Sequence, residues 1–136
     1  MKVIKKVSQE AINELVRGCL NLPQVETPVK HNFSDGVYVR EIFMPGDTFV
    51  IGKKHTTKHL NIVQQGECLV YMEGELHHIV APCTFESNAG VQKVLKVVKD
   101  TVWSTVHVTE ETDIDKLEST LAYKTMEEES LCQWHG

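Results

Sequence analysis

Residues 45–66, PGDTFVIGKKHTTKHLNIVQQG, decide the fold class of this 136-residue chain. The stretch opens on a Pro-Gly-Asp turn, continues through the strand-like run TFVIGKKH, crosses a short polar connection and enters a second run, HLNIVQQ, before Gly66. Short runs rich in β-branched and aromatic residues, bounded by Gly, Pro and Asp, are typical of strands. The stretch therefore predicts two consecutive short strands, with His55 and His59 on either side of the connection.

The same pattern continues on both sides of this stretch. Strand-like runs alternate with short connections that contain Gly, Pro, Asn or Asp, and no helical periodicity interrupts them. Short strands at this spacing, without intervening helices, indicate an antiparallel sandwich or a closed barrel. The further runs are VYVREIFM (37–44), ECLVYM (67–72), LHHIVA (76–81), VQKVLKVV (91–98) and TVWSTVHV (101–108).

A short helix is predicted near each end of the chain. Ser8 can cap a helix over residues 9–17 that ends at Gly18. Towards the C-terminus, Thr112 or Asp113 can cap a second helix, because apolar residues follow at helical spacing. The apolar positions are Ile12, Leu15 and Val16 in the first helix and Ile114, Leu117 and Leu121 in the second.

These elements divide the chain into three parts. Residues 1–35 form a helix and a turn-rich lead-in, residues 36–109 form the barrel, and residues 110–136 form a helix followed by an acidic tail. A chain of this length with 41% hydrophobic and 24% charged residues has room for a single core. The acidic tail lacks a sustained apolar period, so we expect it to be loosely ordered.

Charge is distributed unevenly along the chain. The 14 Lys and Arg against 19 Asp and Glu leave a net charge of -5, which excludes a nucleic-acid binder that works through general basicity. Residues 110–129 contain eight acidic groups and two lysines, so residues 1–109 carry a net charge of +1. The acidity of the whole chain is therefore compatible with a locally positive pocket in the barrel.

The sequence favours a reduced, cytoplasmic setting. Its four cysteines form no Cys-x-x-Cys pair and no spacing typical of a disulfide framework. The N-terminal residues 1–18 are too polar for a signal peptide, and no run approaches the roughly 20 apolar residues of a membrane span. We therefore expect no membrane partner.

Residues 45–66 resemble the first motif of the cupin superfamily. That motif is a Pro-Gly turn, a strand ending in His-x-His, three or four residues, a Glu and, six residues later, a Gly. Counted back from Gly66, His59 stands at the Glu position, His55 at the second His and Lys53 at the first His. Two of the three positions therefore keep a potential metal ligand.

Residues 88–93, NAGVQK, are the closest match to the second cupin motif, and Lys93 stands where that motif has a His. The resemblance implies a mainly β, antiparallel cupin-like barrel, or jelly roll, over residues 36–109. Chains of this size are similar to the single cupins of bacterial viruses. Small cupins often pair by strand exchange or sheet-edge contacts, so we expect a homodimer, in which pairing would protect exposed edges.

A metal centre is the first functional hypothesis. A divalent first-row metal in such a barrel needs three or four His or carboxylate ligands from neighbouring strands. His55 and His59 supply two, and His107 is a third candidate, since it alternates with Trp103 and Thr105 on one face of its strand. The set predicts a three-histidine site for Zn, Fe, Mn or Ni with open positions for a small polar ligand.

A pocket that binds an anion without a metal is the second hypothesis. Lys53 shares the alternation face of His55, and Lys93 occupies the second-motif position. A lysine beside a metal would repel it unless the amine lost its proton, which favours an anionic ligand. Trp103 and Tyr71 are candidate wall residues that could stack on a ligand. Cupins include enzymes as well as non-catalytic binding and interaction proteins, so the sequence leaves open whether this chain is an enzyme.

Overall fold

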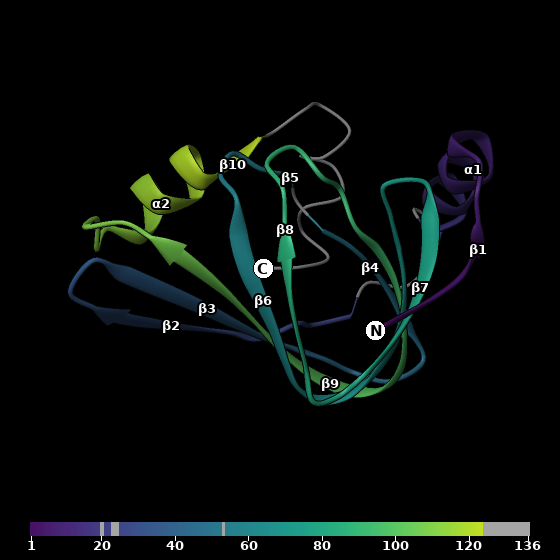
Figure 1. The fold of residues 1–136 in the computed structure, drawn as a ribbon, viewed down its shortest axis with the longest axis horizontal. Coiled ribbons are helices and arrows are strands. Elements are labelled where there is room, and N and C mark those ends of the chain that lie inside the picture. Colours follow the sequence, from purple (N-terminus) through teal and green to yellow (C-terminus); the bar gives the residue numbers. More distant parts are fainter. Residues whose placement is uncertain (20, 23–24, 53, 124–136) are drawn as a thin grey trace.

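The structure, a computed structural model, describes residues 1–19, 21–22, 25–52 and 54–123. Strands predominate within these ranges, and a helix lies towards each end of the chain (Figure 1). In chain order the elements are β1 (Lys2–Lys6), α1 (Gln9–Cys19), β2 (Val29–Ser34), β3 (Val37–Met44), β4 (Thr48–Ile51), β5 (Lys54–His55), β6 (His59–Met72), β7 (Glu75–Val80), β8 (Cys83–Ser87), β9 (Val94–Val108), α2 (Ile114–Leu121) and β10 (Ala122–Tyr123).

Two long strands, β6 and β9, organise the fold. They pair antiparallel along most of their length, from Leu60 opposite Val106 to Tyr71 opposite Val94. One half of the pair is flanked by β8 on one side and by β3 and β2 on the other, whereas the second half is flanked by β7, β1 and β4. Figure 1 shows the sheet folding across β6 and β9 into two arms. The predicted mainly β, antiparallel fold with two helices is confirmed.

Gly66 lies where β6 bends between the two arms. The register between β6 and β9 shifts around this residue, and its φ is 105°. The backbone of β9 passes so close that a Cβ at position 66 would lie 2.5 Å from the carbonyl oxygen of Asp100 and 2.6 Å from the Cα of Thr101. Only a residue without a Cβ allows this approach.

Apolar side chains from both arms fill the space between them. The main cluster consists of Ile42, Met44, Val50, Val63, Cys68, Val70, Met72, Ile79, Leu95, Val97 and Trp103. A second cluster packs α1 against the outside of the arm that contains β4 and β7; its members are Ile12, Cys19, Ile51, Tyr71 and Val94. The main core therefore lies directly beside the strands that carry the predicted site residues.

The strand boundaries differ from the prediction in several places. The runs 59–65 and 67–72 form one continuous strand, β6, and the runs 91–98 and 101–108 are joined in β9. The run 48–55 is instead divided into β4 and β5. The sequence patterns do not predict β1, β2 or β8, which lie at the edges of the sheet.

Both predicted helices form. α1 starts as expected, because the Ser8 hydroxyl accepts a hydrogen bond from the Ala11 amide at 3.1 Å, but it continues past Gly18 to Cys19. Within the described ranges, no helix combines the length and the hydropathy of a membrane span.

Asp113 rather than Thr112 caps α2. The Asp113 carboxylate accepts hydrogen bonds from the amides of Asp115, at 3.0 Å, and Lys116, at 3.3 Å. Such bonds satisfy amides that a helix start otherwise leaves unpaired. The acidic tail expected beyond this helix lies outside the described residues.

Candidate functional site

Three histidines from three different strands converge in the barrel. His55 ends β5, His59 begins β6, and His107 lies near the end of β9. The β6–β9 register, with Leu60 opposite Val106, places His59 beside His107. The ring centroids lie 4.4 Å apart for His55 and His59, 5.0 Å for His55 and His107, and 5.1 Å for His59 and His107.

One ring nitrogen of each histidine is buried and has no hydrogen-bond partner among the described residues. These atoms are Nδ1 of His55, Nε2 of His59 and Nδ1 of His107. The potential ligand atoms of the three side chains all lie within 4.8 Å of one another. Leaving a buried polar atom unpaired costs about 1–3 kcal/mol. A single cation between the rings would satisfy all three nitrogens, so the residues fit a metal ion.

The tautomer of His59 is suited to metal binding. Its Nδ1 lies 3.0 Å from the carbonyl oxygen of Thr57. Since a carbonyl oxygen can only accept, Nδ1 carries the proton and donates it to this bond. Nε2 therefore keeps a lone pair that can bind a metal, and the same hydrogen bond fixes the orientation of the ring.

The three imidazoles are neutral at pH 7. Burial, followed by the neighbouring His59 and His107, lowers the pKa of His55 from 6.5 to about 2. Burial and then His59 lower the pKa of His107 from 6.5 to about 4, and burial also lowers the pKa of His59. Neutral imidazole is the form that binds a metal, so no protons need to leave before binding at this pH.

Other described histidines lie outside this cluster. His77 and His78 point to opposite faces of β7. His77 is buried, whereas His78 lies 2.8 Å from the Glu67 carboxylate. His31 lies on β2 and is half-buried, with its Nδ1 2.6 Å from the Tyr38 hydroxyl. None of them contributes to the three-histidine group.

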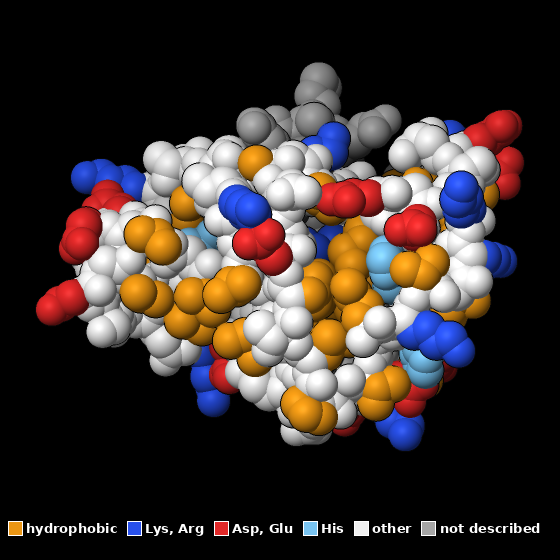
Figure 2. All heavy atoms as spheres, in the orientation of Figure 1, with side chains coloured by type: hydrophobic (Ala, Val, Ile, Leu, Met, Phe, Trp, Pro, Cys, Tyr) orange, Lys and Arg blue, Asp and Glu red, His pale blue; other side chains and the backbone are white. Residues whose placement is uncertain are grey.

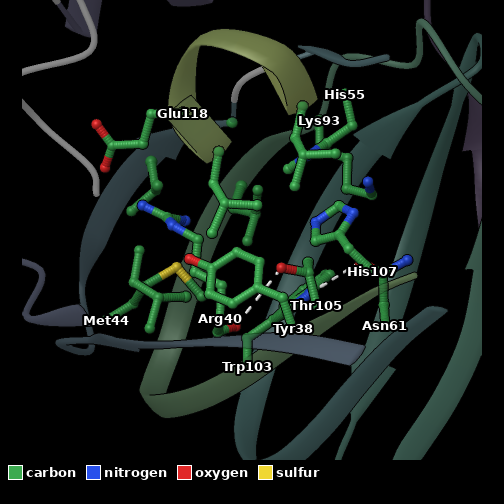
Figure 3. Close-up of a pocket in the computed structure, with 16 residues that line it drawn as sticks. Tyr38, Arg40, Met44, His55, Asn61, Lys93, Trp103, Thr105, His107 and Glu118 are labelled. Carbon is green, nitrogen blue, oxygen red and sulfur yellow. Dashed lines mark hydrogen bonds between the residues drawn. The ribbon is translucent and has the colours of Figure 1, made fainter. Parts of the chain in front are cut away.

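An open pocket adjoins the histidines. Figure 3 shows Lys93 near His107 and His55 on one side of the pocket, and Arg40 and Glu118 on the other side. Met44 and Trp103 lie lower in the view. The lining residues are Tyr38, Arg40, Ile42, Met44, Val50, Gly52, His55, Asn61, Lys93, Leu95, Trp103, Thr105, His107, Leu117, Glu118 and Leu121. The pocket therefore combines polar side chains on two sides with apolar side chains between them.

Helix α2 covers part of this pocket and is hydrogen-bonded to the segment that carries His55. The Thr56 amide donates to the Leu121 carbonyl at 2.8 Å, and the Thr56 hydroxyl donates to the Thr120 carbonyl at 2.7 Å. β10 then pairs with β5, with Ala122 opposite His55. The position of α2 is thus coupled to the position of a candidate metal ligand.

The barrel has counterparts among solved structures. No protein-family model and no curated protein matches the chain. Among solved structures, a cupin domain from Bordetella pertussis is similar with a TM-score of 0.52 and 12% identity, covering 65% of this chain and 99% of that one. An RmlC-like cupin family protein with a double-stranded β-helix fold, from Methanocaldococcus jannaschii, has a TM-score of 0.52 and 13% identity, covering 68% and 86%. The chain has the cupin fold.

A further cupin-fold neighbour is KdgF from Halomonas sp., with a TM-score of 0.54 and 13% identity, covering 68% of this chain and 88% of that one. Identities this low show the fold alone. These three neighbours come from cellular organisms, so they give no support to the expected similarity with viral cupins.

Residues at the two cupin-motif positions lie close together in the structure. His55 and His59 from the first motif and Lys93 from the second surround the same region, together with His107 from β9. Lys93 is only 7% exposed, and no described side chain forms an ion pair with it. Burial lowers the pKa of Lys93 from 10.5 to about 8, against a weaker opposing effect of Glu73. The chain thus places a buried cation where the second motif has a histidine.

The remaining predicted site residues do not all lie in this pocket. Trp103 lines the pocket, and its Nε1 donates to the Asn61 side-chain oxygen at 3.1 Å. Tyr71 is buried beneath α1 and does not line this pocket; it lines a separate hollow together with Glu73. Lys53 lies outside the described residues. The structure therefore brings Trp103 and Lys93 to the histidines and leaves Tyr71 apart from them.

Several pocket residues are missing from the sequence-based set. Tyr38, Arg40, Ile42 and Met44 all line the pocket from β3. The alternation within VYVREIFM puts these four on one face, so that pattern could have identified them. No sequence pattern predicts that α2 lines the pocket, because helical spacing identifies an apolar face but not the surface against which that face packs.

Proposed function

We propose that this cupin-fold chain binds one divalent first-row transition-metal ion through His55, His59 and His107 and holds a small ligand in the adjoining pocket. The observation that carries the proposal is the convergence of three buried imidazole nitrogens without hydrogen-bond partners among the described residues. Imidazole suits Zn, Fe and Ni better than Mn. Of the four metals expected from the sequence, Mn therefore fits this site least well.

The ion and the surrounding residues would have separate roles. A bound ion of this kind supplies a Lewis acid that polarises an oxygen of the ligand. Lys93 would attract an anionic group of the ligand, and the apolar walls around Trp103 would keep water away from it. These roles describe binding and orientation, and we assign no bond-breaking step to any residue.

A metal-independent anion site is the second candidate function. Its support is the buried Lys93, which no described carboxylate approaches as an ion-pair partner. A buried ammonium group is costly unless a counter-charge is present, so a bound anion would offset that cost. The metal content of the purified chain distinguishes the two candidates.

Replacing His107 with alanine should reduce metal binding. We expect about one equivalent of Zn, Fe or Ni in the unmodified chain after incubation with the metal and dialysis, and less than about a tenth of an equivalent in His107→Ala, because two ligands hold such an ion poorly. Elemental analysis by inductively coupled plasma mass spectrometry measures both values.

His78→Ala is the matched control for this experiment. His78 is half-exposed on β7, hydrogen-bonded to Glu67 and outside the three-histidine group, so its loss should leave the metal content unchanged. Equal metal content in the unmodified chain and His107→Ala, or no retained metal in either, would rule out the proposed centre. His55→Ala provides an independent repeat from a different strand.

We also propose that the chain forms a homodimer through a sheet edge. β1 is an edge strand whose Val3 is 47% and Ile4 50% exposed. Such edges favour pairing with another strand. Light scattering after size exclusion should give twice the mass of one chain, and Ile4→Asp should give the mass of one chain. A single-chain mass for the unmodified protein would contradict the proposal.

Cytoplasmic localisation remains a prediction from the sequence. So does the expectation that the chain has neither a nucleic-acid nor a membrane partner.

A further inference from the structure

We infer that the pocket selects an organic carboxylate with an apolar body, whose charged group lies at Lys93 and whose body lies along the walls formed by β3, β4, β9 and α2. This inference rests on the proposed ligand pocket. It is carried by the juxtaposition, in one cavity, of a buried cation and a group of apolar side chains from these four elements.

The charged part of the pocket favours an anion. Lys93 is 7% exposed, and no described side chain forms an ion pair with it. Figure 3 shows Glu118 on the side of Arg40 and Met44, away from Lys93. Glu118 is therefore not placed to compensate the charge of Lys93. A carboxylate is a matching counter-charge, and a proposed metal ion beside it would attract the same group.

The walls argue against a sugar or another polyhydroxylated ligand. Away from the histidines, a few polar side chains line the pocket, Tyr38, Arg40, Thr105 and Glu118, beside a larger apolar group. The apolar group consists of Ile42, Met44, Val50, Leu95, Leu117 and Leu121. Figure 2 shows how such side chains gather in the hollow between the two arms. Each ligand hydroxyl buried against such walls without a partner would lose its hydrogen bonds to water, which disfavours binding. An aromatic ring or a short alkyl chain loses nothing of this kind and buries apolar surface instead.

Two polar groups near the walls already have partners inside the protein. The Trp103 Nε1 donates to Asn61, and the Asn61 amide donates to the Ser87 hydroxyl at 2.8 Å. Trp103 therefore presents aromatic surface to a ligand, and the hydrogen-bonding groups of Trp103 and Asn61 are already used within the protein. The pairing reduces the capacity of the pocket to recognise several hydroxyls at once.

Calorimetric titration with matched small molecules tests the inference. The probes are 3-phenylpropanoate, its neutral amide, glucuronate and inorganic phosphate, each added to the full chain with its metal content measured. We expect 3-phenylpropanoate to bind at least tenfold more tightly than each of the other three. Equal or tighter binding of glucuronate or phosphate would overturn the apolar-body assignment, and equal binding of the amide would overturn the carboxylate assignment.

Two variants locate the bound molecule. Lys93→Met should weaken 3-phenylpropanoate binding at least tenfold, whereas Lys99→Met, which changes an exposed lysine on β9, should not. Leu121→Gln should weaken the same ligand while leaving phosphate unaffected. Unchanged binding in Lys93→Met would overturn the inference.

The metal measurement separates this inference from the proposed function. A chain that retains its metal but binds none of the four probes refutes the ligand class alone. A chain that retains no metal yet binds 3-phenylpropanoate through Lys93 refutes the metal centre and supports the ligand class.

Discussion

Replacing Gly66 with alanine should lower the free energy of unfolding by about 3 kcal/mol or more, among the larger effects that a single substitution produces. Gly66 has a φ of 105°, which an L residue with a Cβ adopts only under strain. The new Cβ would also meet the Thr101 hydroxyl, and it would lie 2.5 Å from the Asp100 carbonyl oxygen. These atoms belong to the bend of β9, so they cannot move aside without disturbing the central strand pair. Urea denaturation followed by circular dichroism measures the change.

Gly74→Ala separates backbone strain from the steric clash. Gly74 also has a positive φ, 78°, but an added Cβ there would meet nothing within 4 Å. We expect this control to cost only about 1–2 kcal/mol, the penalty for left-handed backbone alone. If the two variants lose the same stability, the close approach of β6 and β9 at Gly66 is not the source of the effect.

The sequence predicts the site residues that follow from strand alternation or from the cupin motif. Alternation along TVWSTVHV puts Trp103, Thr105 and His107 on one face, and all three line the pocket. The count through residues 45–66 assigns His55 and His59 to motif positions, and both join the histidine group. The first inference succeeds because side-chain direction in a strand has a period of two and does not depend on distant residues. The second inference comes from the resemblance to the cupin motif.

The sequence does not anticipate features that depend on contacts between distant elements. β1 is KVIKK, with every residue exposed, so it lacks the alternation that identifies a half-buried strand. The closure of the pocket by α2 depends on hydrogen bonds from Thr56 to the end of that helix, which no local pattern encodes. Tyr71 lies on the same strand as His59, but the bend in β6 places it under α1 instead of in the pocket.

Lys93→Met should raise the free energy of unfolding at pH 7 by up to about 3 kcal/mol, even though it removes the proposed anion contact. The pKa of Lys93 falls from 10.5 to about 8 in the folded chain, and each tenfold loss of proton affinity corresponds to about 1.4 kcal/mol. Because the folded-state pKa is the lower one, the charge destabilises the native state fully below pH 8. That cost is relieved as the pH rises from about 8 to 10.5, where the unfolded chain also loses the proton. Methionine is unbranched and apolar, so it can fill the same space without a charge.

The pH dependence distinguishes this explanation from a general packing effect. In chelator-treated protein, urea denaturation at pH 7 and pH 10.5 should show the stability advantage of Lys93→Met shrinking at the higher pH, since the lysine of the unmodified chain is then neutral in the folded state and largely so in the unfolded one. Lys99→Met, at an exposed position of β9, should change stability little at either pH. An advantage of equal size at both pH values would attribute the gain to packing, and a loss of stability at pH 7 would mean that the Lys93 ammonium group is compensated within the fold. If the advantage shrinks at pH 10.5 as expected, the charge of Lys93 lowers the stability of the fold. Residues that bind a ligand often carry such a cost.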